Sequence, residues 1–448
     1  MTSTFRPRPA RRRPSLLLST VTFVAAVAIL VAACGSPAPS ATPGASAGVT
    51  PAATPGTTAT PVASATPAPS GNTSAVYRAI EDQVVEERGL PAKKRLEPAV
   101  LSESEVKERI KEQYAKDNPA DEIAVAGETL KALGLLPADA SLGDLYVDLL
   151  GSQVAGFYDP ETKETVVVSK SGTIGGPEKV TFAHEFTHAL QDQSFGLEGI
   201  DVDAVGQGDR SLGRLALVEG DATLLMTRWL ASNLAAAELR ELLQIDPEAQ
   251  AQLLRMPAIL RESLLFPYQQ GLMFVNGIWA KGGWEAVDAA YGRLPDSTEQ
   301  ILHPEKYQAG EKPVDVPLDA DALAKAMGSG WSGTPEDTLG EFQLSIWLKE
   351  NGVKALAAGD AAKGWGGDRL AYLRGPDGAH ALALATTWDT AADAEEFIAA
   401  ATTAAGELPG AARVERGADP QSAWVFAASD ALTVDRIAQA ARGLVLGG

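Results

Sequence analysis

His184-Glu185-Phe186-Thr187-His188 is the stretch from which the rest of this 448-residue chain can be interpreted. In a helix, two histidines four residues apart lie on the same face, so both imidazoles can reach one metal ion. Pro177 suits the first turn of such a helix, which we expect to run to about Gln193. Apolar residues surround the motif, and unpaired histidines in a buried helix would be costly. The pattern therefore predicts a zinc site on a buried helix.

A catalytic zinc site needs more than two histidines. Glu185 lies between them, where it can take a proton from water rather than bind the metal. Zinc takes three protein ligands in such sites and leaves a fourth position open. No later histidine is close in sequence, so we predict Glu219 as the third ligand, on a helix packed against the histidine helix. Gly220 supports this, because a glycine within a helix indicates a close approach of another helix.

These motifs resemble those of the gluzincin metallopeptidases, the thermolysin-like Peptidase MA clan. Longer strings are similar to poorly characterised bacterial membrane-anchored members: Gly-Phe-Tyr-Asp-Pro at 156–160, His-Ala-Leu-Gln-Asp-Gln at 188–193 and Ser-Thr-Glu-Gln-Ile-Leu-His-Pro at 297–304. The resemblance covers about residues 75–310. It implies a zincin-like core, one Zn²⁺ held by His184, His188 and Glu219, and Glu185 as the general base for zinc-activated water.

The resemblance also implies how substrate and metal are supported. In that fold the hairpin before the zinc helix supplies an edge strand that pairs with extended peptide, and the candidate here is residues 164–169. Thermolysin has an Asp four residues after the ligand Glu, where this chain has Thr223. The residues that could brace a zinc-binding histidine are therefore Asp221 and Asp192.

A gluzincin usually supplies a Tyr or His that stabilises the oxyanion of the tetrahedral intermediate. Residues 297–300 have the pattern of a capping box that opens a short helix. His303 ends that helix, because it precedes Pro304. Tyr268 follows Pro267 at the expected start of an apolar helix. Both His303 and Tyr268 are candidates for the catalytic role.

The N-terminal residues 1–33 have the pattern of an export signal. A basic segment ends at Arg13, an apolar run follows, and small residues precede Cys34. This resembles the lipobox of bacterial lipoproteins, in which the cysteine receives a lipid. The alternative is an uncleaved transmembrane helix. Either arrangement places the rest of the chain outside the cytoplasm, because the arginines of the basic segment stay on the cytoplasmic side of the membrane. Residues 34–74 are rich in Pro, Ala, Ser and Thr, a composition typical of a disordered tether.

Charge and cysteine content exclude several classes of protein. The chain has 38 basic and 58 acidic residues, a net charge of −20. Removal of the signal peptide with its five arginines gives −25, which argues against binding of nucleic acid or anionic lipid by the body itself. Membrane attachment would fall to the lipid on Cys34. A single cysteine excludes a disulfide framework and a cysteine-based zinc site.

The predicted fold class is α+β. A mainly helical zincin-like metallopeptidase domain spans 75–312, with a β-hairpin at 153–170 before the HExxH helix. A small α+β subdomain spans 313–448. Its expected strands are 370–374, 379–388 and 423–428, and its expected helices are 391–405 and 432–444.

The predicted function is a lipid-anchored, extracytoplasmic zinc metallopeptidase that hydrolyses peptide or protein substrates. An endopeptidase is favoured because no motif that captures a substrate N-terminus is recognisable. Two alternatives stay open. One is an aminopeptidase or a dedicated processor of one membrane protein. The other is a non-proteolytic, zinc-containing surface lipoprotein that acts as a binding module. The oligomeric state is not predicted.

Overall fold

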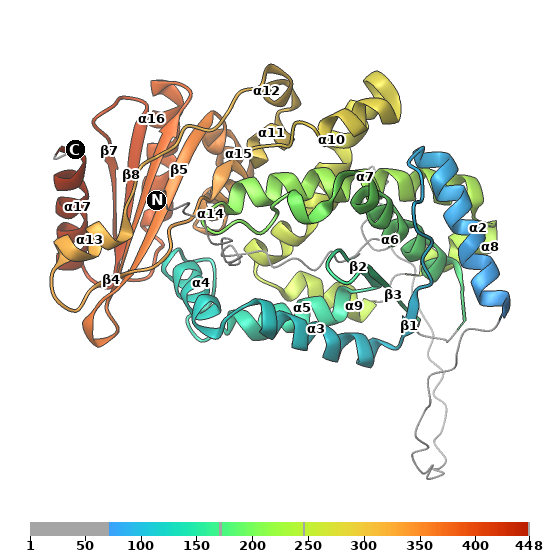
Figure 1. Ribbon diagram of the computed structural model, residues 1–448. Coiled ribbons are helices and arrows are strands. Elements are labelled where there is room, and N and C mark those ends of the chain that lie inside the picture. The colour runs from blue at the N-terminus through green and yellow to red at the C-terminus, as the bar shows by residue number, and fades with distance from the viewer. Residues whose placement is uncertain (1–70, 170–172, 245–246, 447–448) are drawn as a thin grey trace, which may run out of the picture.

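Two small sheets and the helices around them place the chain in the α+β class, as predicted (Figure 1). The computed structural model describes residues 71–169, 173–244 and 247–446. The predicted signal peptide, Cys34 and the tether up to residue 70 lie outside the described residues. Helix α2 begins at Gly71, four residues before the expected start of the metallopeptidase domain.

The first part of the chain contains one three-stranded sheet among its helices. Its elements are α2 (Gly71–Arg88), β1 (Ala99–Leu101), α3 (Glu103–Asp117), α4 (Ala120–Ala132), α5 (Leu142–Gln153), β2 (Gly156–Asp159), β3 (Glu164–Val168), α6 (Gly176–Phe195), the 3₁₀ helix η1 (Leu197–Gly199), α7 (Gly208–Asn233), α8 (Ala236–Leu242), α9 (Pro247–Arg255), α10 (Ala258–Ala290), α11 (Thr298–Leu302) and α12 (Pro304–Ala309).

The second part contains a five-stranded sheet. Its elements are α13 (Ala320–Met327), β4 (Ser332–Gly333), α14 (Gly340–Glu350), α15 (Ala355–Ala362), β5 (Trp365–Arg374), the 3₁₀ helix η2 (Pro376–Gly378), β6 (His380–Trp388), α16 (Ala391–Ala405), β7 (Ala411–Arg416), β8 (Ser422–Ala428) and α17 (Ala431–Leu446).

The hairpin expected before the histidine helix is present as β2 and β3. Strand β3 is the central strand, in the order β1-β3-β2, because β1 pairs with it in parallel on its other side. The prediction that residues 164–169 form an edge strand is therefore wrong. The error arose because β1 has only three residues, Ala99–Leu101, and so short a segment shows no alternating pattern.

The outer edge of the hairpin belongs to β2. The backbone N–H of Val168 donates to the carbonyl of Ala155 at 2.7 Å. This bond shows which residues of β2 direct their backbone groups toward β3 and which direct them away. By alternation, Gly156 and Tyr158 direct their N–H and C=O groups away from β3. Both residues are buried beside α6: Tyr158 is 2% exposed, and a Cβ on Gly156 would lie 2.6 Å from the side chain of Thr181.

The histidine helix α6 forms as predicted. Pro177 lies in its first turn, and the Glu178 carboxylate accepts a hydrogen bond from the Gly175 N–H at 2.9 Å. The helix ends at Gly196, whose φ of 74° is the left-handed conformation that glycine adopts without strain. Residues 180–192 of this helix are all buried.

Helices α7 and α10 pack so closely that glycine is required at their contact. A Cβ on Gly220 would lie 2.3 Å from the carbonyl oxygen of Gly271, and a Cβ on Gly271 would lie 2.2 Å from that of Ala216. The inference that Gly220 marks a close helix contact is confirmed. The helix that approaches Gly220 is α10, whereas Glu219 faces α6.

Helix α10 begins ten residues before Tyr268, so that residue does not open a helix as expected. Pro267 lies inside α10, although a proline there removes one backbone hydrogen bond. Phe266 and Phe274, on either side of Pro267, pack in one hydrophobic cluster with residues of α7, which explains why the helix continues. A break at Gly282 and Gly283 separates its last turns from the rest.

The C-terminal sheet is antiparallel in the order β4-β5-β6-β8-β7. Helices α14, α15 and α16 cover one face, and α13 and α17 cover the other (Figure 1). The three expected strands correspond to β5, β6 and β8, and both expected helices are present as α16 and α17. Strand β5 begins five residues earlier than predicted, at Trp365, and β4 and β7 were not predicted.

The two parts of the chain share one hydrophobic core. Side chains of α4, α5 and the start of α10 pack in the same cluster as the sheet face under α14–α16. The amide of Asn351 donates to the carbonyl of Leu133 at 3.0 Å, and Arg374 binds Glu128 through two hydrogen bonds. No helix within the described ranges is long and apolar enough to span a bilayer.

Replacing Gly271 with Ala should lower the free energy of unfolding by about 2–3 kcal/mol, because the backbone of α7 leaves no room for a methyl group. Gly277 is the matched control on the same helix, since no atom outside the local backbone lies within 4 Å of the position that an added methyl group would take. Gly277→Ala should be neutral or stabilising by up to about 1 kcal/mol. Urea unfolding followed by circular dichroism measures both, and equal effects would contradict the close contact.

Candidate metal centre

Three ligand atoms from α6 and α7 converge on one point. His184 Nε2 and His188 Nε2 lie 3.0 Å apart. The Glu219 Oε2 atom is 3.2 Å from the first and 3.4 Å from the second. The structure therefore brings the three predicted ligands together, and each of their side chains is buried.

The donor set and its spacing fit a zinc ion. Ligand atoms about 2.0–2.1 Å from a tetrahedral zinc lie about 3.3 Å from one another, close to the three separations found here. Two Nε2 atoms 3.0 Å apart cannot both carry a proton toward each other, so at least one presents a lone pair. The second oxygen of Glu219, Oε1, meets hydrogen-bond geometry with none of the described residues, although a hydrogen bond between the Tyr268 and Glu219 side chains contributes to the raised pKa of Tyr268.

Electrostatics within the cluster also favour a cation. Burial raises the pKa of Glu219, but His188 and hydrogen bonds from both histidines lower it to about 2. Burial lowers the pKa of His188, but the charge of Glu219 more than offsets this and raises it to about 9. Burial also lowers the pKa of His184, which stays below its usual value. The buried carboxylate thus draws positive charge to this point.

Glu185 lies beside this cluster with a carboxylate that no other side chain engages. Its side chain is 0% exposed, and burial raises its pKa well above the usual value. The charge of His188 lowers that pKa but does not offset the effect of burial. The backbone amide of Tyr158 on β2 lowers that pKa, but neither oxygen meets hydrogen-bond geometry with any described residue. The outer edge of β2 therefore faces the predicted base.

Asp221 is connected to the histidines through Gln191, a residue that the sequence alone did not single out. The Gln191 side chain lies 2.8 Å from His188 Nδ1 through its Oε1 atom and donates from Nε2 to Asp221 at 3.0 Å. Asp221 therefore contacts His188 only through Gln191. The available signal was the position of Gln191 three residues after His188, which places both on one face of the helix.

Asp192 contacts the β2–β3 hairpin and the start of η1 rather than a histidine that it was expected to brace. It accepts hydrogen bonds from the Tyr158 hydroxyl at 2.7 Å and from the Leu197 backbone at 3.1 Å, and it pairs with Lys163 at 2.9 Å. These contacts tie the end of α6 to the β2–β3 hairpin. The interactions of Asp192 do not include His184 or His188 within the described residues.

Of the two oxyanion candidates, Tyr268 lies at the metal centre. Its ring centroid is 6.3 Å from that of His184, and its side chain is buried. Burial raises its pKa well above the usual value, and the charges of Glu219 and Glu185 add to this. A phenol with so high a pKa stays protonated and can donate a hydrogen bond.

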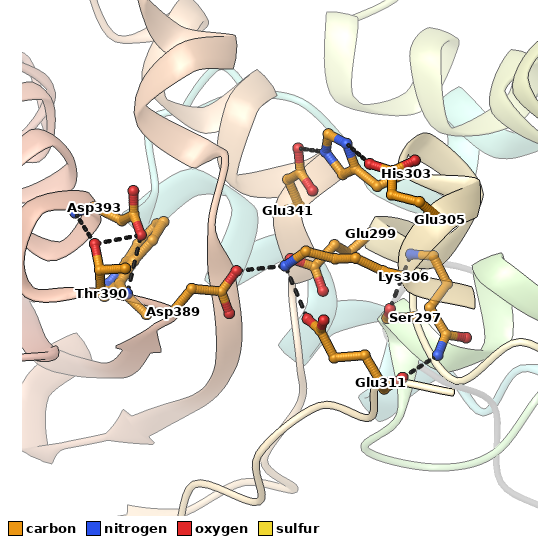
Figure 2. A network of polar contacts seen from close by, with 12 residues as sticks. Ser297, Glu299, His303, Glu305, Lys306, Glu311, Glu341, Asp389, Thr390 and Asp393 are labelled. Atoms are coloured by element: carbon orange, nitrogen blue, oxygen red, sulfur yellow. Dashed lines mark hydrogen bonds and ion pairs between the residues drawn. The ribbon is translucent and has the colours of Figure 1, made fainter. Parts of the chain in front are cut away.

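His303 is placed elsewhere, in a polar network shown in Figure 2. Its Nε2 atom lies 2.9 Å from Glu341 on α14, and its Nδ1 atom lies 3.7 Å from Glu305. His303 ends α11 as expected, and the Ser297 hydroxyl caps that helix. The capping box is only half formed. The Gln300 side chain accepts a hydrogen bond from the backbone N–H of Asp296 instead of from that of Ser297.

Glu299, Glu311 and Asp389 form a second group of carboxylates close enough to share a cation. Lys306 lies among them (Figure 2). Its ammonium is 2.7 Å from Glu299 and 2.9 Å from Glu311, and it also contacts Asp389. The lysine supplies the positive charge that this group needs. The network joins α11 and α12 to the β6–α16 loop of the C-terminal sheet.

Comparison with known proteins bears on the C-terminal part alone. A family described as "Domain of unknown function (DUF8575)" matches residues 329–446, which include the five-stranded sheet and α14–α17. No curated protein and no solved structure matches the chain. The matched range contains none of the residues of the metal centre.

Proposed function

We propose that this protein is a zinc-dependent metallopeptidase of the gluzincin type, with a zincin-like core. The observation that carries the proposal is the convergence of His184, His188 and Glu219, with separations of 3.0–3.4 Å, beside the buried Glu185 carboxylate, whose oxygens meet hydrogen-bond geometry with no side chain in the described ranges. A structural metal site needs no such additional base.

The chain's own residues have distinct roles in this proposal. His184, His188 and Glu219 hold Zn²⁺, which supplies the Lewis acidity that activates water and polarises a carbonyl. Glu185 accepts the proton of the attacking water and passes it to the leaving amine. Tyr268 donates a hydrogen bond to the developing oxyanion. An extended peptide binds along the outer edge of β2, which faces Glu185, rather than along β3.

The burial of the centre favours a second candidate function. All four of the side chains His184, Glu185, His188 and Glu219 are 0% exposed. A closed site of this kind is typical of structural zinc, as in a non-proteolytic surface lipoprotein that acts as a binding module. Stoichiometric zinc together with no cleavage of any peptide would support this alternative.

Glu185→Gln should keep zinc and lose hydrolysis by about 100- to 10,000-fold in kcat, because it removes the base and no ligand. His184→Ala should lose both zinc and hydrolysis. Zinc is measured by mass spectrometry of the purified full-length protein, and hydrolysis with casein and a peptide library.

Glu178→Gln is the matched control for this substitution. Glu178 is a buried glutamate on the same helix that accepts from the backbone of Gly175, and glutamine can also accept that bond. The control should retain both zinc and activity. Wild-type rates from Glu185→Gln would refute the mechanism, and wild-type protein without stoichiometric zinc would refute the proposed centre.

Tyr268→Phe should lower kcat on the order of 100-fold with little change in KM, because it removes one oxyanion donor and keeps the ring. His303→Gln should leave kcat unchanged, since His303 pairs with Glu341. Steady-state kinetics on one peptide substrate measures both variants. A larger loss from His303→Gln than from Tyr268→Phe would reverse the assignment.

We propose that a lipid on Cys34 anchors the protein to the outer side of the cytoplasmic membrane. The support is the sequence pattern of residues 1–34, with its basic segment, apolar run and small residues before the cysteine. Mass spectrometry of protein from the membrane fraction should show a lipid-modified Cys34 as the first residue. An N-terminal fragment that retains residues 1–33 with unmodified Cys34 would instead indicate a transmembrane helix.

A further inference from the structure

The side chain of Gln191 has only one orientation that its surroundings allow. Its amide nitrogen lies 3.0 Å from the Val218 carbonyl and 3.0 Å from the Asp221 carboxylate, and both of these groups can only accept hydrogen bonds. The NH₂ end must therefore face Val218 and Asp221. The amide oxygen is left to face His188.

This orientation determines which nitrogen of His188 carries a proton. The Gln191 Oε1 atom lies 2.8 Å from His188 Nδ1 and can only accept, so Nδ1 carries the proton. In the neutral imidazole the lone pair is then on Nε2, the atom that points at His184 and Glu219. Neutral His188 is thus held in the tautomer that a metal ligand needs.

Asp221 is fixed in turn by a buried arginine at the end of α2. Arg88 donates from Nε to one oxygen of Asp221 at 2.8 Å and from Nη2 to the other at 3.1 Å. The Tyr291 hydroxyl donates to Asp221 as well, at 2.8 Å. Both Arg88 and Asp221 are 0% exposed. Such a bidentate, buried pair holds the carboxylate in one geometry.

We propose that the chain of contacts from His188 through Gln191 and Asp221 to Arg88 is a positioning relay. It holds His188 in the orientation and tautomer that metal binding needs. The inference rests on the proposed function, because it concerns the affinity of the same three-ligand centre for zinc. Gln191 acts on the ligand directly, Asp221 orients Gln191, and Arg88 orients Asp221 and balances its charge. The relay also makes α2 part of the metal centre, although α2 supplies no ligand.

The test is the zinc affinity of the purified full-length protein, measured by competition with a chelating dye. Gln191→Met keeps the side-chain volume and removes the hydrogen bonds, and should raise the zinc Kd by about 10- to 100-fold. Arg88 and Asp221 are replaced together, as Arg88→Met with Asp221→Leu, so that neither of the two is left as an unpaired buried charge. Asp288, which also pairs with Arg88 at 2.7 Å, has a side chain that is 38% exposed to solvent. This double variant should weaken zinc binding on the order of 10-fold.

Asp192→Asn is the matched control. Asp192 follows Gln191 on the same helix and is also a buried partner in an ion pair, with Lys163, but it does not contact His188. Its replacement should lower the thermal midpoint and leave the zinc Kd unchanged. An unchanged Kd in Gln191→Met, or an equal loss in Asp192→Asn, would overturn the relay. Wild-type protein that binds no zinc would instead overturn the proposed function.

Discussion

The burial of several ionisable side chains between α6 and α7 is the constraint on which the rest of the structure depends. Removing a carboxylate or an imidazolium from water costs several kcal/mol unless opposite charge and hydrogen bonds offset it. Glu219 is offset within the cluster by the two histidines, and Asp221 by Arg88. The Glu185 carboxylate meets hydrogen-bond geometry with none of the described residues, and the charge of His188 does not offset the effect of its burial. In the proposed function a divalent cation completes the balance.

Helix α7 meets this constraint with three consecutive residues. Successive residues of a helix point about 100° apart, so neighbours in sequence face different elements. Glu219 faces α6 and the histidines, Gly220 faces the backbone of α10, and Asp221 faces Gln191 and Arg88. One turn of α7 therefore supplies the proposed ligand, the close contact with α10 and the charge that orients Gln191.

The features that could be predicted from sequence are those with local signals. Pro177 and the surrounding apolar residues identify α6, and the glycine after Glu219 indicates its close contact. Strands β1 and β4 could not be predicted, because they are short and form only by pairing with strands far along the chain. Strand β7 pairs with the next strand, β8, but charged residues interrupt its apolar pattern. The absence of β1 from the prediction led to the wrong edge strand. The choice between Tyr268 and His303 and the importance of Gln191 depend on tertiary contacts that no local pattern encodes.

The ion pair between Arg88 and Asp221 has a consequence for the order of events during folding. These two residues are 133 positions apart, and Tyr291 lies 70 positions beyond Asp221. Contacts between such distant residues form only after long loops have closed. A growing chain that ends before Asp221 contains both histidines of α6 but lacks the carboxylate that orients Gln191. If the centre binds zinc as proposed, the orientation of His188 by Gln191 is therefore established only late in folding.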